Sequence, residues 1–129
     1  MPGAREFLER CIDSGLNVIL LTSRNIGEYP NLMMDTVQWL KMNELPYDFI
    51  WWAKNKTEKL VERDVLHNVV LAVDDDLRFV KQFDGMNVST YWIRQNGDWD
   101  MTAAELLINT RFVRSLDEIN IKKEMSFNG

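Results

Sequence analysis

The sequence predicts an α/β domain with a mostly parallel sheet, and three observations support that prediction. Short apolar runs at Val18–Leu21, Phe49–Trp52 and Val69–Val73 are bounded by polar or turn-forming residues. Such continuous runs are typical of strands that are buried on both faces of a parallel sheet. Segments with apolar residues at helical spacing lie between these runs, as in β–α–β units. Two of the runs end in polar clusters, and ligands bind at the carboxyl ends of parallel strands.

The bulk composition fits one globular domain, which we expect over residues 1–119. The chain has 129 residues and a formal net charge of −5, which argues against a nucleic-acid binder with a broad basic surface but is compatible with a local basic pocket. The single cysteine, Cys11, excludes an internal disulfide and falls on the apolar face of a predicted helix. No run approaches the roughly 18 apolar residues of a membrane span, and the N-terminus lacks a signal-peptide pattern, so we expect a cytoplasmic protein.

Helices and strands are expected to alternate through the first half of the chain. The apolar spacing over residues 4–12 predicts an amphipathic helix that ends at Gly15. The run Val18–Leu21 follows as a strand, and a second amphipathic helix is expected to end near Asn43. Phe49–Trp52 is the next expected strand.

The same alternation is expected beyond residue 54. Asn55 and Glu58 have the spacing of a capping box, which predicts the start of a helix. The run Val69–Val73 is expected to be a buried strand. Leu77–Phe83 then predicts a short helix, and Val88–Ile93 predicts a fourth strand.

The C-terminal part is expected to be helical and then frayed. Thr102 and Glu105 have the spacing of a capping box, and the apolar spacing over residues 104–112 predicts the helix that would follow it. Ser115 is expected to start one further turn. The tail, residues 120–129, is expected to fray.

Three consecutive carboxylates, Asp74, Asp75 and Asp76, follow the run Val69–Val73. Adjacent carboxylates repel one another and must be solvated, protonated or neutralised by a cation. Because Mg²⁺ prefers oxygen ligands, the cluster predicts a magnesium site. The alternative is a solvated loop in which an aspartate caps the following helix.

A second polar cluster, Thr22-Ser23-Arg24, follows the run Val18–Leu21. A hydroxyl and backbone N–H groups at this position can bind a phosphate oxygen, and Arg24 can bind phosphate with two parallel hydrogen bonds. This cluster therefore predicts a phosphate-binding site. The alternative is a turn with a surface arginine.

Three lysines, Lys54, Lys56 and Lys59, form a small basic cluster in an acidic chain. Lys59 would lie in the first turns of the helix that is expected to start after Asn55. One of these lysines is expected to neutralise a phosphate or the acidic cluster. The alternative is a solvated group of charges.

The order of these segments resembles the haloacid dehalogenase-like (HAD) superfamily over about residues 2–93. Leu20-Leu21-Thr22 is similar to the second motif of that family, and Ala72-Val73-Asp74-Asp75 is similar to the fourth. Lys59 matches the lysine of the third motif, with Lys56 and Lys54 as alternatives. Thr22-Ser23-Arg24 is similar to the Ser-Gly-Arg of the phosphatase domain of phage polynucleotide kinase/3′-phosphatases. That subfamily has an acidic residue four positions before the lysine, where this chain has Asn55.

The resemblance implies a three-layer, Rossmann-like HAD fold with a mostly parallel sheet. It also implies an Mg²⁺-dependent phosphohydrolase that acts on the 3′ ends of nucleic acids. The alternatives are a small-nucleotide phosphatase and a non-catalytic phosphate- or metal-binding regulatory protein. The implied roles are catalysis for Thr22 and Lys59, binding of the substrate phosphate for Ser23 and Arg24, and binding of Mg²⁺ for Asp74 and Asp75.

The first motif of the family, Asp-x-Asp-x-Thr or Val, is missing from its expected position. In the family this motif ends the central strand and supplies the nucleophile and the general acid/base. Asp98 and Asp100 fit the pattern, but four residues separate Asp98 from the preceding expected strand, so a permuted site is one alternative. The others are a longer enzyme, a remnant without a nucleophile, and a second copy or a C-terminal segment that fills the vacant position. We therefore expect a sheet that lacks its usual first, central strand, and either a rearranged sheet or a close oligomer.

Overall fold

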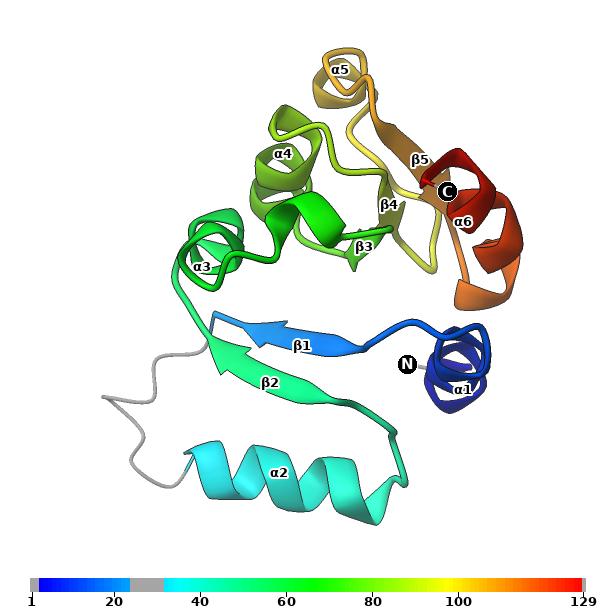
Figure 1. Ribbon diagram of the computed structural model, residues 1–129. Helices are drawn as coiled ribbons and strands as arrows, with labels where there is room; N and C mark the ends of the chain where they lie inside the picture. The colour runs from blue at the N-terminus through cyan, green and yellow to red at the C-terminus, as the bar shows by residue number, and fades with distance from the viewer. Residues whose placement is uncertain (1–2, 24–31, 129) are drawn as a thin grey trace. The chain divides into compact units, whose positions relative to one another are not determined.

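The computed structural model describes residues 3–23 and 32–128, which form an α/β fold of two compact units, Met1–Lys54 and Asn55–Gly129 (Figure 1). Every strand pair in both units is parallel, which confirms the predicted α/β class. The described strands form two sheets, one in each unit, where the sequence predicted one mostly parallel sheet. Among the described residues, no helix has the length and apolar character needed to cross a membrane.

The first unit contains a two-stranded parallel sheet. Its elements are α1 (Ala4–Asp13), β1 (Ile19–Thr22), α2 (Leu32–Met42) and β2 (Phe49–Trp52). Cys11 is a buried residue of α1, as its position on the apolar face predicted. β1 and β2 pair along their whole length, with Thr22 opposite Trp52. Both polar segments that follow these strands therefore leave the sheet at the same end.

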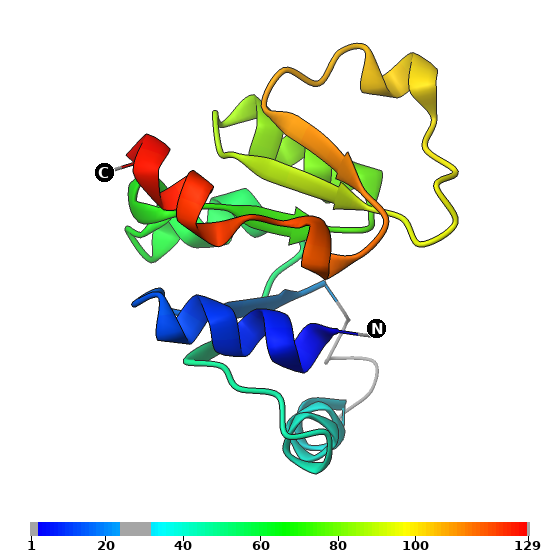
Figure 2. The ribbon, with the colours of Figure 1, turned by 90° about the vertical axis from the view of Figure 1, so that its right-hand side faces the viewer.

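The second unit contains a three-stranded parallel sheet in the order β3-β4-β5. Its elements are α3 (Lys56–Glu62), the short 3₁₀ helix η1 (Leu66–Asn68), β3 (Ala72–Asp74), α4 (Leu77–Gly85), β4 (Thr90–Ile93), α5 (Met101–Ala104), β5 (Thr110–Val113), the 3₁₀ helix η2 (Leu116–Glu118) and α6 (Ile121–Asn128). All four residues of the central strand β4 are buried. Successive side chains of a strand point to opposite faces, so Trp92 packs with Val80 of α4 while Tyr91 bonds to Glu124 of α6. Helices α4 and α6 thus lie on opposite faces of this sheet (Figures 1 and 2).

The helix predicted over residues 104–112 is wrong, because α5 ends at Ala104 and Thr110–Val113 forms the strand β5. The buried side chain of Asp84, at the end of α4, explains the difference. Its carboxylate accepts hydrogen bonds from the backbone N–H of Asn109 at 2.7 Å and from the hydroxyl of Thr110 at 2.7 Å. These bonds fix the chain at the start of β5, where it pairs with β4 and cannot continue a helix.

The tail predicted to fray forms the helix α6, of which Ile121 and Glu124 are buried. The Glu124 carboxylate accepts hydrogen bonds from the hydroxyl of Ser89 at 2.7 Å and from the hydroxyl of Tyr91. Buried carboxylates need such partners, and here the partners lie on the strand segment that α6 covers. Glu124 therefore holds the helix on the sheet.

Candidate functional site

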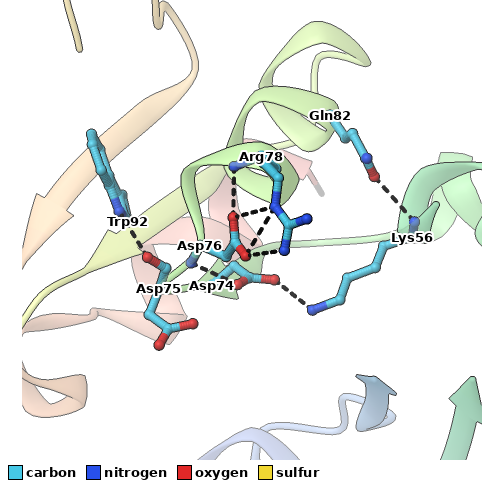
Figure 3. Close-up of polar contacts among 7 residues, drawn as sticks. All are labelled: Lys56, Asp74, Asp75, Asp76, Arg78, Gln82 and Trp92. Carbon is cyan, nitrogen blue, oxygen red and sulfur yellow. Dashed lines mark hydrogen bonds and ion pairs between the residues drawn. The ribbon is translucent and has the colours of Figure 1, made fainter. Parts of the chain in front are cut away.

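The acidic cluster lies at the carboxyl end of β3, and its three side chains have different environments. Asp74, the last residue of the strand, is buried. Its carboxylate accepts a hydrogen bond from the Lys56 ammonium at 2.7 Å and another from the backbone N–H of Asp76 at 3.0 Å (Figure 3). The cluster is therefore neutralised at Asp74 by a cation of the protein itself.

Lys56, the first residue of α3, is held by groups of α4 as well as by Asp74 of β3. Asn55 caps α3 by accepting a hydrogen bond from the backbone N–H of Glu58 at 2.9 Å. The backbone N–H of Lys56 donates to the side-chain oxygen of Gln82 in α4 at 3.1 Å, and the Lys56 ammonium lies 4.2 Å from the centroid of the Phe79 ring. The ammonium is thus fixed between an aromatic face and a carboxylate.

The ion pair between Lys56 and Asp74 is largely withdrawn from solvent, with side-chain exposures of 12% and 7%. Burial raises the pKa of the Asp74 carboxyl above its usual value, and the hydrogen bond from Lys56 opposes that rise. Asp75 adds to the rise by charge repulsion. Removal of either partner would leave an uncompensated buried charge, so the two residues depend on each other.

Asp76 caps α4, in agreement with the alternative that a carboxylate of the cluster caps the following helix. It accepts hydrogen bonds from the backbone N–H of Arg78 at 2.9 Å and from the Arg78 guanidinium at 2.7 Å. The guanidinium holds the pKa of Asp76 below its usual value. The carboxylate of Asp76 is therefore committed to the start of α4.

Asp75 is the exposed member of the cluster. Its backbone carbonyl accepts a hydrogen bond from the indole N–H of Trp92 at 3.2 Å, which fixes the backbone at the strand end. Figure 3 shows the Asp75 carboxylate pointing away from the Lys56 ammonium. Among the residues the structure describes, this carboxylate has no hydrogen bond or ion pair, so it is the group of the cluster that is open to a ligand.

The structure brings Lys56, rather than the favoured Lys59, to the acidic cluster. The Lys59 ammonium lies 3.7 Å from the Glu62 carboxylate, and Lys54 is an exposed residue before the helix. Lys56 contacts Asp74 because it is the first helical residue, beside the strand end. The supporting roles of Gln82 and Trp92 were not predicted, since no local pattern links either residue to the cluster.

The described residues provide few ligands for Mg²⁺. Within residues 3–23 and 32–128, no group of three or more His, Cys, Asp or Glu side chains is placed to hold a metal ion. Asp74 and Asp75 are left as candidate ligands, and Asp74 already bonds to Lys56. Mg²⁺ is commonly bound by one or two carboxylates together with water and a substrate phosphate. The residues thus fit a site that is completed by substrate and do not form a cage of protein ligands.

The residues of the other polar cluster lie in the first unit. Thr22 ends β1, and its backbone carbonyl accepts a hydrogen bond from the N–H of Ala53 at 2.9 Å. Thr22 also lines an open pocket of about 440 Å³ to which Asp35 and Trp39 contribute. Ser23 is exposed, and Arg24 lies outside the described residues.

Asp98 and Asp100 both have structural partners. Arg94 donates to both oxygens of Asp98, at 2.9 and 3.0 Å, and lowers the pKa of that carboxyl. Asp100 caps α5 by accepting hydrogen bonds from the backbone N–H groups of Thr102 and Ala103. Asp100, rather than the predicted Thr102, therefore starts this helix.

Comparison of the chain with protein-family models, with curated proteins and with solved structures found no match.

Proposed function

We propose that the carboxyl end of β3 is the phosphate-handling site of a HAD-type, Mg²⁺-dependent phosphohydrolase fold. The substrate class that we propose is nucleic acid with a phosphorylated 3′ end. The observation that carries the proposal is the buried ion pair between Lys56 and Asp74, 2.7 Å apart at the end of a parallel strand. Ligands bind at this end of open parallel sheets. A fixed ammonium beside an exposed carboxylate suits a ligand that is anionic and is itself bound through a metal.

Lys56 would supply electrostatic stabilisation of the phosphoryl group. Its ammonium is already held by Asp74 and the Phe79 ring, and its backbone by Gln82, so little reorganisation is needed when an anion arrives. Fixed charges of this kind are among the larger contributions to catalysis of phosphoryl transfer. Asp74 would hold the ammonium in position and keep the pair neutral when no phosphate is bound.

Mg²⁺, when bound, would neutralise the charge that develops on the phosphoryl oxygens. Asp75, together with Asp74, would hold it directly or through water, and the substrate phosphate would supply further oxygens. The exposed Asp75 carboxylate, whose backbone is fixed by Trp92, supports this assignment. Thr22 and Ser23 belong to the first unit, so their roles, like that of Arg24, rest on the resemblance alone.

A second candidate function is non-catalytic binding of phosphate. It is favoured by the contacts of Asp98 and Asp100. Asp98 accepts two hydrogen bonds from Arg94, and Asp100 caps the helix α5. Both aspartates therefore have structural partners in this arrangement. A binding protein would need Lys56 and Asp75 but no attacking group.

The test compares Lys56→Gln with the matched control Lys59→Gln in the full chain. With Mg²⁺ present, we expect Lys56→Gln to reduce hydrolysis of an aryl phosphate and of a 3′-phosphorylated oligonucleotide about 100-fold, because a fixed charge at the phosphoryl group is lost. Lys59→Gln removes the same charge one turn along the helix and is expected to have a much smaller effect. Free nucleotides, assayed in parallel, distinguish a small-nucleotide phosphatase.

The outcomes separate the candidates. Turnover that depends on Lys56 supports the hydrolase, and turnover abolished by Asp98→Asn would instead support a permuted site. Mg²⁺-dependent binding of inorganic phosphate without turnover, lost in Lys56→Gln, supports the binding protein. A wild-type chain that neither hydrolyses nor binds phosphate contradicts the proposed site.

A further inference from the structure

Two arginines follow the carboxyl ends of the neighbouring strands β4 and β5. Ile93 and Val113, the last residues of these strands, are partners in the parallel register, so Arg94 and Arg114 leave the sheet side by side. The backbone N–H of Arg94 donates to the carbonyl of Val113 at 3.0 Å. Both arginines therefore lie at the carboxyl ends of the strands, as the acidic cluster after β3 does.

The Arg114 guanidinium lies over the backbone of Gly97. A Cβ atom at Gly97 would lie 2.7 Å from Nε and 2.7 Å from Nη2 of Arg114, so a side chain at residue 97 would displace the guanidinium from this position. Gly97 also has a φ of 68°, in the left-handed region that favours glycine. The glycine in the turn after Arg94 thus leaves space for the side chain of Arg114.

One of the two guanidinium groups is paired with a carboxylate and the other is not. Arg94 is paired with Asp98 and lies within electrostatic range of Asp75. Arg114, by contrast, has no carboxylate within ion-pair distance among the residues described in the second unit, although its backbone N–H donates to Glu118. The carboxyl end of the sheet therefore has an open carboxylate, Asp75, after β3 and a guanidinium without a carboxylate partner among the described residues, Arg114, after β5.

The spacing of the strands defines the kind of ligand that fits this end of the sheet. Adjacent strands lie about 4.8 Å apart, so the ends of β3 and β5 are separated by roughly 10 Å. A ligand that carries two anionic groups, one near each strand end, would match this separation.

We propose that Arg114, seated over Gly97 beside Arg94, binds an internal phosphodiester group of a nucleotide chain whose phosphorylated end lies at β3. This inference rests on the proposed function, because it places the phosphorylated end at Lys56. The planar guanidinium matches the geometry of two phosphate oxygens, and a local cation of this kind is compatible with the acidic net charge. The site would distinguish an oligonucleotide from a small phosphate ester.

The test measures binding of a fluorescently labelled, 3′-phosphorylated single-stranded oligonucleotide by anisotropy, over a series of salt concentrations. Arg114→Gln is expected to weaken binding about fivefold and to lower the slope of log K against log salt by about 0.7, the value for one lost phosphate contact on a single strand. Arg114→Lys keeps the charge but loses the planar fork, so part of the affinity is expected to return. Gly97→Ala, which displaces the guanidinium, is expected to resemble Arg114→Gln.

Lys122→Gln is the matched control, since it removes one exposed positive charge from α6. Equal losses in Arg114→Gln and Lys122→Gln, or no binding of the oligonucleotide by the wild-type chain, overturn the inference. Inorganic phosphate serves as the second probe. If binding of inorganic phosphate does not depend on Lys56 but binding of the oligonucleotide depends on Arg114, the proposed function is contradicted. The arginine site is then still supported.

Discussion

Individual residues of the acidic cluster acquire their roles from burial and partners, not from their type. Asp74 is buried against Lys56, Asp76 caps α4, and Asp75 faces solvent. Like charges at neighbouring positions are tolerated because two of the three are compensated by different cations, Lys56 and Arg78. The remaining carboxylate is therefore the one with freedom to bind a ligand.

The buried contact between Tyr91 and Glu124 predicts a loss of stability at high pH. Burial, together with the hydrogen bond to Glu124, raises the pKa of Tyr91 to about 12 from 10.0. A group whose pKa is raised on folding contributes stability that is complete below the unfolded pKa and is lost as the pH rises through the folded pKa. We expect the difference in free energy of unfolding between the wild type and Tyr91→Phe to be largest below pH 10 and to shrink between pH 10 and about 12.

Urea unfolding at a series of pH values measures this difference, and alkaline absorbance titration of the phenols gives the pKa directly. Tyr47→Phe is the matched control for loss of a phenol outside this contact. A difference that stays constant from pH 8 to 12 would contradict the assignment of a pKa of about 12 to Tyr91.

Among the elements, β5 depends on one carboxylate of another element. Asp84→Ala removes the acceptor for the backbone N–H groups of Ile108 and Asn109 and for the hydroxyl of Thr110. Donors left without a partner at a partly buried site cost about 1–3 kcal/mol, so we expect a loss of about 3 kcal/mol in the free energy of unfolding. Asp100→Ala, which removes only the cap of the short helix α5, is expected to cost about 1 kcal/mol.

Denaturant unfolding and amide hydrogen exchange distinguish the two variants. Exchange in β5 is expected to accelerate in Asp84→Ala and to change little in Asp100→Ala. The opposite ranking of the two variants would mean that the cap, rather than the carboxylate at the end of α4, determines the path of the chain into β5.

Elements with a strong local signal could be predicted from the sequence, and those fixed by distant contacts could not. The apolar run Phe49–Trp52 is a strand over the predicted bounds, and Ser115 and Glu118 form a capping box at the predicted turn. β5 was missed because residues 104–112 also fit a helical spacing, and the contact that overrides it comes from Asp84, more than 20 residues earlier. Helix α6 was missed for the same reason, since the buried Glu124 is bonded to Ser89 and Tyr91, more than 30 residues earlier in the chain.

In the candidate site, too, features with a local sequence signal could be predicted and those fixed by distant contacts could not. The strand end and its three aspartates could be predicted because an apolar run ends abruptly in charges. The choice between Lys56 and Lys59 could not be predicted, because both lie on one short helix whose rotation about its axis is set by packing. The pairing of Lys56 with Asp74 is fixed by the contacts of α3 with α4, including the bond to Gln82.

At the scale of the whole molecule, the described strands are divided into two small sheets, one in each unit. β3 pairs with β4 on one side and ends its sheet on the other. The run Val69–Val73 that leads into it contains no charge and no proline, and it is only partly buried, whereas the central strand β4 is fully buried. Edge strands in native proteins are commonly protected by charges, prolines or bulges.

We expect the chain to self-associate through this strand, which is one of the two outcomes predicted from the sequence, a rearranged sheet or a close oligomer. Leu71 directly precedes β3. A charge beside an edge strand opposes the approach of another strand, so Leu71→Lys is expected to shift the chain toward the monomer. Leu71→Ala, which removes a similar apolar contact without adding charge, is expected to associate as the wild type does. Light scattering coupled to size exclusion measures the mass over a range of concentrations, and circular dichroism checks that each variant is folded. A wild-type chain that is monomeric at all concentrations contradicts this prediction. Equal dissociation of both variants would show instead that Leu71 acts through packing within its own unit.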